Sequence, residues 1–413
     1  MQRRIIELKG HILDSHILPR VLDAIVEQGG DFSIEHISIG KTNTDPSYAR
    51  LAVAAADEGV WEQVWEAIQP LGAVLLTEKE AELKPAPQDG VFPDNFYTTT
   101  NLETRVRLAG GWVPVEGMEM DCGIRVDPPA GRAVCVPIHR VRRGDLIVVG
   151  NEGVQVTPLE RPRQREVFSF MGSAVSSERP KGLVIAGIAR EMRAVRRRGG
   201  KILVVLGPAV IHTGAGQYLE RLIRAGFVQT LFAGNAVATH DIESALYGTS
   251  LGVSLASGEA VPEGHSHHLR AINAIRGVGG IRPAVASGLL TKGVMYTAVQ
   301  TGVDYVLAGS IRDDGPLPDV ISDTLAAQEA MRALLPGTEL ALMLGTMLHS
   351  IAVGNLLPAR VRLVCVDINP AVVTKLVDRG SFQAVGVVSD VEWFLRQLAF
   401  ELLDKKEHLA KGV

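Results

Sequence analysis

The sequence predicts an α/β protein of three domains, and three features support this. Its 413 residues exceed the length that one hydrophobic core usually organises. Short apolar runs recur at spacings typical of strands and helices, and 43 glycines lie among them, as turns between strands and helices require. The order of these elements changes twice along the chain. We therefore expect domains over residues 1–85, 86–175 and 176–413.

Residues 1–85 are predicted to fold in the order β-α-β-β-α-β. Leu18, Val21, Leu22 and Ile25 show the spacing of one helical face, and several neighbouring runs alternate between apolar and polar residues. This order is typical of a ferredoxin-like α+β module, and the segment carries no obvious chemistry. The strands are expected at 5–12, 32–39, 49–55 and 73–76, and the helices at 17–27 and 60–68.

Residues 86–175 are predicted to be rich in β-structure. Glycine and proline punctuate their short apolar runs, which indicates a small barrel or sandwich. Glu119 and Asp121 are expected on one face of a strand, beside Cys122. In that position the Asp121 carboxylate could take a proton from an amine. A turn carboxylate next to a buried thiol is the alternative.

From residue 176 onward, short strands alternate with helices. Such alternation predicts a parallel sheet with helices on both faces, which is a Rossmann-like domain. The stretch between Glu339 and Arg360 has no charged residue, yet it contains His349, Asn355 and Pro358, so we expect a buried strand, turn and helix there and no membrane span.

The strongest chemical signal follows the apolar run at 340–344. Gly345 ends that run, and the amides at the start of the next helix would suit a pyrophosphate. About twenty residues further on, the strand at 362–367 ends in Asp367, the position from which a carboxylate binds the ribose hydroxyls of NAD and disfavours NADP. A tight turn and a helix-capping aspartate would produce a similar pattern.

Three further groups are weaker signals. The loop from His212 to Gly216 is glycine-rich and could bind a ligand or only turn the chain. Asn235 and Asp390 each follow a predicted strand, where ligands gather in open sheets. The histidines at 265, 267 and 268 lack nearby carboxylates or thiols, so a metal is not expected.

Composition excludes several classes of protein. The net charge is only −4, and the arginines at 193–198 suit a solvated helix face, so we expect no nucleic-acid partner. The three cysteines are too few and scattered for a disulfide framework, and the first residues do not form a secretory signal. We expect a cytoplasmic homo-oligomer with a small-molecule substrate and no membrane partner.

The sequence resembles the family named for a conserved region of lysine–oxoglutarate reductase/saccharopine dehydrogenase proteins. The best characterised activity of this family is NAD-dependent ornithine cyclodeaminase of the archaeal type, and the same unit forms the C-terminal part of arginine dihydrolase fusions. The blocks that carry the resemblance span most of the chain: Phe92-Pro-Asp-Asn-Phe-Tyr-Thr-Thr-Thr-Asn101, Met120-Asp121, Phe232-Ala-Gly-Asn-Ala236, His240-Asp241-Ile-Glu243, Ala271-Ile-Asn-Ala-Ile-Arg276, Lys292-Gly-Val-Met-Tyr296, Gly345-Thr-Met-Leu-His-Ser350 and Val366-Asp367-Ile-Asn-Pro370.

The resemblance implies a cofactor, a reaction and a set of contacts. The cofactor would be NAD, and the reaction would convert L-ornithine to L-proline and ammonia, within arginine and ornithine metabolism, with the hydride borrowed from Cα and returned. A cation must hold the substrate carboxylate, for which Arg270 and Arg276 are candidates, and a base must deprotonate an amine, for which Asp121 and Lys292 are candidates. The contacts that the resemblance implies for NAD are Asn235, Ala236, Asp314, Thr346, Met347, Leu348, His349, Asp367, Asp390 and Val391.

Two other functions stay open at this point. One is a net NAD-dependent dehydrogenase acting on lysine or saccharopine, which would release free NADH. The other is a regulator without catalytic activity that binds NAD and is built on the ferredoxin-like module.

Overall fold

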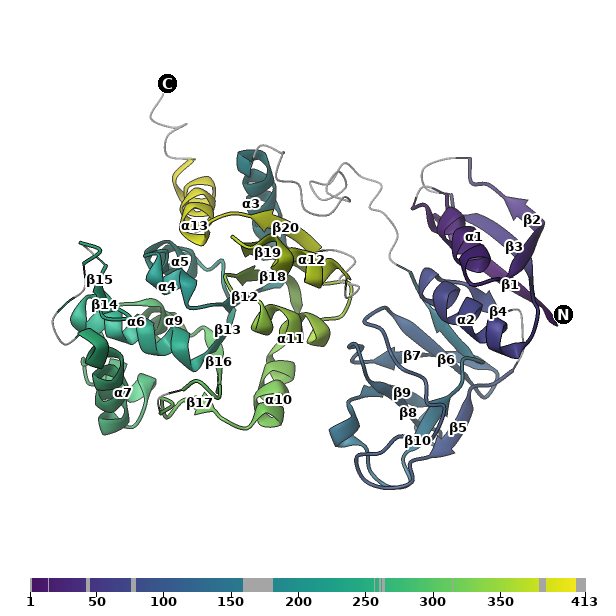
Figure 1. Cartoon of the computed structure of the whole chain (residues 1–413), viewed down its shortest axis with the longest axis horizontal. Helices are drawn as coiled ribbons and strands as arrows, with labels where there is room; N and C mark the ends of the chain where they lie inside the picture. Colours follow the sequence, from purple (N-terminus) through teal and green to yellow (C-terminus); the bar gives the residue numbers. More distant parts are fainter. Residues whose placement is uncertain are drawn as a thin grey trace. The chain divides into compact units, whose positions relative to one another are not determined.

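The computed structural model describes residues 2–13, 15–41, 45–75, 79–158, 181–255, 257–259, 261, 264–313, 315–378 and 384–405. Contacts divide the chain into two units. The first contains residues 1–169 with 355–360, and the second contains residues 170–354 with 361–413. Each unit is described by itself (Figure 1). The division into three domains at 85 and 175 stays a prediction.

The N-terminal part of the first unit has the expected ferredoxin-like order. Its antiparallel sheet runs β2-β3-β1-β4, so that the two middle strands belong to different halves of the β-α-β-β-α-β repeat. Trp61, Val64 and Trp65 of one helix and Val21 and Ile25 of the other are buried in a common core. The elements are β1 (Gln2–Gly10), α1 (Ile17–Glu27), β2 (Asp31–Ser38), β3 (Ser47–Ala55), α2 (Glu58–Ile68) and β4 (Val74–Leu75).

The β-rich part that follows forms one sheet of seven strands in the order β11-β6-β7-β9-β8-β10-β5. This differs from the two separate sheets of a sandwich. Only β7 and β9 pair in parallel; the other neighbours are antiparallel. The strands are β5 (Glu82–Pro85), β6 (Thr104–Leu108), β7 (Gly111–Glu116), β8 (Gly123–Asp127), β9 (Arg132–Val136), β10 (Leu146–Val149) and β11 (Val154–Val156).

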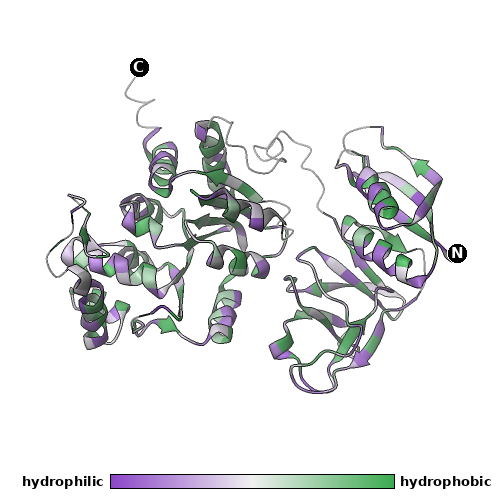
Figure 2. Cartoon of the chain, in the orientation of Figure 1, coloured by the Kyte–Doolittle hydropathy of each residue, from purple (hydrophilic) through white to green (hydrophobic). Residues whose placement is uncertain are grey.

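The second unit is built on a parallel seven-stranded sheet in the order β17-β16-β13-β12-β18-β19-β20, which confirms the Rossmann-like prediction. Its central strands are almost continuously buried apolar runs, as expected for strands covered on both faces (Figure 2). The strands are β12 (Lys201–Leu206), β13 (Thr230–Gly234), β16 (Asp304–Ala308), β17 (Val320–Ile321), β18 (Thr338–Leu344), β19 (Arg362–Asp367) and β20 (Ala384–Val388).

Helices cover both faces of this sheet. Helices α3 (Lys181–Arg198), α5 (Gly216–Arg224) and α9 (Val294–Thr301) lie in one layer with α13 (Val391–Ala399), and α13 packs against α3 and α5. Helices α10 (Thr324–Leu334), α11 (Leu348–Leu356) and α12 (Pro370–Asp378) lie on the other side of the strands (Figure 1). Among the described helices, none is both long enough and apolar enough to cross a membrane.

A further group of elements in the second unit lies toward one end of its sheet (Figure 1). They are α4 (Ala209–His212), α6 (Asn235–Tyr247), α7 (His267–Val278), α8 (Ile281–Ala286) and the hairpin of β14 (Thr249–Ser250) and β15 (Val253–Ser254). The chain winds outward from β12 in one direction and from β18 in the other. Such a switch point leaves a crevice at the carboxyl ends of the two strands, where ligands bind in doubly wound sheets.

Candidate functional site

Two glycines meet at the switch point. The amide of Gly207, which directly follows β12, donates to Leu344 O at 2.8 Å. A Cβ added to Gly207 would lie 1.8 Å from Gly345 O. Gly345 has φ +61°, and a Cβ there would lie 3.0 Å from Ala209 Cβ. The backbones of the two loops therefore approach as closely as glycine allows, and a side chain at Gly207 would force them apart.

The second glycine loop identified from the sequence lies elsewhere. Gly214 and Gly216 are separated from the end of β12 by the short helix α4. A Cβ added to Gly214 would meet nothing within 4 Å. Gly207 takes its place at the crevice, and the signal that could have revealed it is its position directly after the apolar run at 201–206.

A third close approach lies at the end of β13. A Cβ added to Gly234 would lie 2.9 Å from Cε1 of His349, so this histidine ring packs on the glycine backbone. Burial lowers the pKa of His349, which favours its neutral form. Asn235 begins α6 and is buried, and its Oδ1 accepts from Leu317 N at 3.1 Å. Ala236 follows it in the first turn of the helix.

The loop after β18 differs slightly from the sequence prediction. The helix begins at Leu348, so Thr346 and Met347 form a short turn between Gly345 and α11. The hydroxyl of Ser350 donates to Thr346 O, which closes that turn. The first amides of α11 are thereby brought to the carboxyl edge of the sheet, where the N-terminal end of a helix attracts anions.

Two acidic residues lie at the ends of the next strands. Asp367 is half-buried at the end of β19, and its Oδ1 accepts from Asn369 N at 2.8 Å. Its Oδ2 accepts no hydrogen bond from any described residue and is the oxygen left for a ligand. Asp390 caps α13 by accepting from Trp393 N at 3.0 Å. Val391 Cγ2 lies 3.3 Å from the position of a Cβ on Gly345.

The residues expected to contact the cofactor thus follow the carboxyl ends of β13, β18, β19 and β20. Asp314 lies outside the described residues. This grouping of close glycine contacts, helix starts and a strand-end carboxylate fits an extended dinucleotide such as NAD.

The expected substrate arginines lie on α7 and are both exposed. Arg276 Nη1 donates to the carbonyl oxygen of Pro316 at 2.7 Å, so this guanidinium already has a structural partner. Lys292 is also exposed and lies just before α9. Asp241, to which the sequence analysis assigned no role, caps α9 by accepting from Val294 N at 2.9 Å and Met295 N at 2.8 Å.

The expected strand at Asp121 is wrong. Residues 119–122 form a loop, β8 begins at Gly123, and Asp121 is exposed with φ +61° while Glu119 is buried. The reason is tertiary: the amides of Met120 and Asp121 bond to Asn355 O at 3.0 Å and Thr99 O at 3.1 Å instead of a neighbouring strand. A non-glycine residue in the left-handed region is uncommon and recurs at functional sites.

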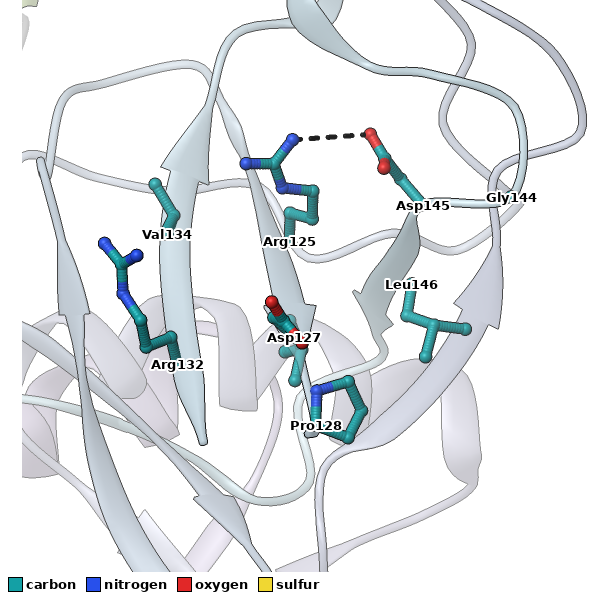
Figure 3. A pocket seen from close by; sticks show the side chains of 9 residues that line it. Arg125, Asp127, Pro128, Arg132, Val134, Gly144, Asp145 and Leu146 are labelled. Carbon is teal, nitrogen blue, oxygen red and sulfur yellow. Dashed lines mark ion pairs between the residues drawn. The ribbon is translucent and has the colours of Figure 1, made fainter. Parts of the chain in front are cut away.

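A pocket of about 360 Å³ opens on the β-rich sheet (Figure 3). Its two arginines already have carboxylate partners: Arg125 lies 3.7 Å from Asp145, and Arg132 bonds to Glu116 at 2.6 Å. None of the expected site residues lines it, and we assign it no function. The lining residues are Arg125, Val126, Asp127, Pro128, Arg132, Val134, Gly144, Asp145 and Leu146.

The parallel sheet and the residues at the carboxyl ends of its strands define a Rossmann-fold protein with a crevice suited to a dinucleotide. Three family models match the chain along almost its full length. The LOR/SDH bifunctional enzyme conserved region matches residues 3–102, the first region of the arginine dihydrolase ArgZ-like C-terminal part matches 103–185, and its Rossmann fold matches 186–398.

Comparison with known proteins identifies the family to which this chain belongs. The chain is 55% identical to the ornithine cyclodeaminase of Methanothermobacter thermautotrophicus over 97% of this chain and 98% of that protein. The apo structure of ArgZ, a cyanobacterial arginine dihydrolase, superposes with a TM-score of 0.85 at 42% identity, over 98% of this chain and 59% of ArgZ. A ternary complex of AgrE with ornithine and NAD⁺ has a TM-score of 0.54 at 45% identity, over 100% of this chain and 58% of AgrE. The chain belongs to the ornithine cyclodeaminase family.

Proposed function

We propose that this chain is an NAD-dependent ornithine cyclodeaminase, which converts L-ornithine to L-proline and ammonia. The observation that carries the proposal is 55% identity to an ornithine cyclodeaminase over 97% of this chain. The glycine contacts at the switch point and the free oxygen of Asp367 support the cofactor. The AgrE complex supports both ligands, because that relative holds ornithine and NAD⁺ together.

For the cofactor, each proposed contact has a chemical reason. The amides of Thr346, Met347, Leu348 and His349 would receive the pyrophosphate at the start of α11. Asp367 would bind the ribose hydroxyls through Oδ2. Asn235, Ala236, Asp314, Asp390 and Val391 complete the proposed contacts.

When bound, NAD would accept the hydride of Cα and return it to the same carbon, which leaves the reaction redox-neutral. The protein must then hold the substrate carboxylate, orient the δ-amine toward Cα and move protons between the two nitrogens. Arg270 and Arg276 remain the proposed carboxylate ligands, and Asp121 and Lys292 remain proposed bases.

The deciding experiment follows the hydrogen on Cα. The purified protein is incubated with NAD⁺ and L-ornithine that carries deuterium at Cα and ¹⁵N at the α-nitrogen. We expect proline that keeps the deuterium, ammonia that carries the ¹⁵N, and no accumulation of free NADH.

Other outcomes of the same experiment identify the rivals. A net dehydrogenase would leave the deuterium on released NADH. A lyase that forms a carbanion would exchange the deuterium with water. Binding of NAD⁺ and ornithine without any product would indicate a regulator without catalytic activity.

Assembly and location also belong to the proposal. We propose a cytoplasmic homo-oligomer without nucleic-acid or membrane partners. Light scattering on the eluting peak of a gel-filtration column measures the oligomeric state, and a mass equal to one chain would rule out the oligomer.

A further inference from the structure

A buried carboxylate and several histidines form a cluster in the second unit. Glu243 of α6 has no exposed surface. Its oxygens accept hydrogen bonds from His240 Nδ1 at 2.8 Å, Thr249 Oγ1 at 2.9 Å and the amides of Leu251 and Gly252 at 3.2 and 3.1 Å. Burial raises the pKa of Glu243, but the hydrogen bonds outweigh that effect and lower it overall. The carboxylate is therefore ionised at neutral pH.

The hairpin of β14 and β15 is shaped to supply two of these donors. Leu251 and Gly252 form its turn, with φ values of +54° and +73°. Positive φ at both central residues is typical of a tight two-residue hairpin turn. A leucine there costs about 1–2 kcal/mol, and the turn directs both amides at Glu243. Four hydrogen-bond donors therefore fix the position of the Glu243 carboxylate.

Glu243 also orients the ring of His240. Because Nδ1 donates to an ionised carboxylate, the hydrogen of the neutral ring lies on Nδ1 and Nε2 carries the lone pair. The side chain of His240 is only 11% exposed. The ring of His212 meets it edge-on at 4.8 Å between centroids, and the ring of His268 is tilted at 6.5 Å. A proton acceptor oriented by a buried carboxylate is the arrangement that general bases use.

The neighbouring histidines come from two other helices. From α4, Nδ1 of His212 lies 2.7 Å from Ser250 Oγ, and burial, then His240, lowers the pKa of His212. From α7, His267 Nδ1 lies 2.9 Å from Thr249 Oγ1, which itself donates to Glu243. Among the described residues, no group of three or more histidine, cysteine, aspartate or glutamate side chains could hold a metal ion. The arrangement suits proton transfer.

This cluster lies beside the crevice. His212 ends α4, the helix that begins at Ala209, and Ala209 Cβ lies 3.0 Å from the position of a Cβ on Gly345. His240 lies in the second turn of α6, which starts directly after β13. A dinucleotide in a doubly wound sheet spans both halves of the crevice, and Asp367 marks one half on β19. The cluster lies by the opposite half, over β12 and β13, where the nicotinamide and the substrate would lie.

We propose that His240 is a catalytic residue of the cyclodeaminase reaction, with Glu243 as its positioning residue; this rests on the proposed function above. Nε2 accepts a proton from the δ-nitrogen as that nitrogen bonds to Cα. It delivers this proton to the α-nitrogen as the bond between Cα and that nitrogen breaks and ammonia leaves. The imidazole ends each turnover as it began, and the electrons balance because the hydride taken from Cα is returned.

The test removes the ring and restores it from solution. His240→Gly should lower kcat for proline formation by about 10²- to 10⁴-fold, the usual contribution of a general acid–base group. NAD⁺ affinity should stay within about threefold, since the ring accepts a proton and does not hold the pyrophosphate. Added imidazole should restore part of kcat. Added 1,2,4-triazole, which has the same ring size and is a much weaker base, should not.

A second variant tests the positioning role. Glu243→Gln keeps the size of the side chain, and it should lower kcat at least tenfold with little change in ornithine KM. His36→Gln, on the exposed strand β2, is the matched control and should behave as the native protein.

The outcomes separate the two proposals. If the native protein forms no proline from ornithine, the proposed function fails. If it forms proline but His240→Gly keeps more than a third of kcat, or if triazole rescues as well as imidazole, the role of His240 is overturned while the function stands. If His240→Gly does not fold, Glu243→Gln decides: native kcat in that variant would overturn the proposal.

Discussion

Asp241 is a fully buried carboxyl group whose task is to cap another helix. Burial raises its pKa to about 7, although the amides of Val294 and Met295 donate to it and act in the opposite direction. A Cβ on Gly293 would lie 2.8 Å from Asp241 Oδ2, so a side chain at that position would displace the cap. The glycine and the aspartate therefore form one local unit, and it lies next to Lys292.

This pKa predicts a pH dependence of stability. The folded protein holds the Asp241 proton more tightly than the unfolded chain, whose value is 3.8. The resulting stabilisation is complete below about pH 4 and is lost as the pH rises through about 7. Urea unfolding from pH 4 to 8 should show a fall in the free energy of unfolding that Asp241→Asn largely removes. The same slope in both proteins would contradict this assignment, and Asp323→Asn, an exposed helix cap, is the control.

Asp367 predicts the choice of cofactor. Its free Oδ2 should bind the ribose hydroxyls of NAD and repel the extra phosphate of NADP. Asp367→Ala should weaken NAD⁺ binding by about 1.5–3 kcal/mol, the scale of a charge-assisted hydrogen bond. Calorimetric titration of both cofactors measures this. Equal affinity of the native protein for NAD⁺ and NADP⁺ would contradict this role of Asp367.

Some of these residues could be predicted from the sequence and others could not, for a physical reason. Gly345 and Asp367 stand next to long apolar runs, so local spacing alone places them at strand ends. The pairing of Asp241 with the start of α9 spans more than fifty positions. The contact of His212 with His240 likewise joins two different βα turns. Such contacts depend on how the helices pack, which no single-sequence pattern records.

At the scale of elements, the turn after β12 and the turn after α4 predict two very different responses to one added methyl group. Gly207→Ala places a Cβ 1.8 Å from Gly345 O, so backbone must move and the two central loops separate. We expect loss of NAD⁺ binding and strong destabilisation in urea unfolding. Gly214→Ala is the matched control, because its φ is +76° and nothing lies within 4 Å; it should cost only about 1–2 kcal/mol. Similar losses in both variants would show that crowding is not the cause.

Regular elements were predictable wherever burial made the pattern continuous. The parallel strands β12, β18 and β19 are buried on both faces, and their apolar runs could be identified directly from the sequence. The prediction failed at residues 119–122, where apolar and polar residues alternate as in a strand. There the amides of Met120 and Asp121 bond to Asn355 and Thr99, and burial does not follow the alternation, because Glu119 is buried and Asp121 is exposed.

At the scale of the whole molecule, one segment joins the first unit from far along the chain. Residues 355–360 belong to that unit, and Ala359 N donates to Asn101 O at 2.8 Å. Ala359 also packs with Leu102 and Val156. No sequence pattern indicates this, because these residues continue an uncharged stretch that begins in β18. They include the last two residues of α11 and the residues that lead from it toward β19.

The last prediction concerns the ferredoxin-like module. Its core is formed within residues 6–75, whereas the glycine contacts and Asp367 all lie beyond residue 200. A chain that starts at residue 79 should therefore fold and bind NAD⁺ within about threefold of the native affinity, a difference of less than 1 kcal/mol. A start at residue 90 would also remove β5, which pairs with β10, so that shorter chain should unfold at a lower urea concentration. Circular dichroism and NAD⁺ titration of both chains measure the two effects. Loss of binding in a well-folded chain that starts at 79 would mean that the N-terminal module completes the cofactor site.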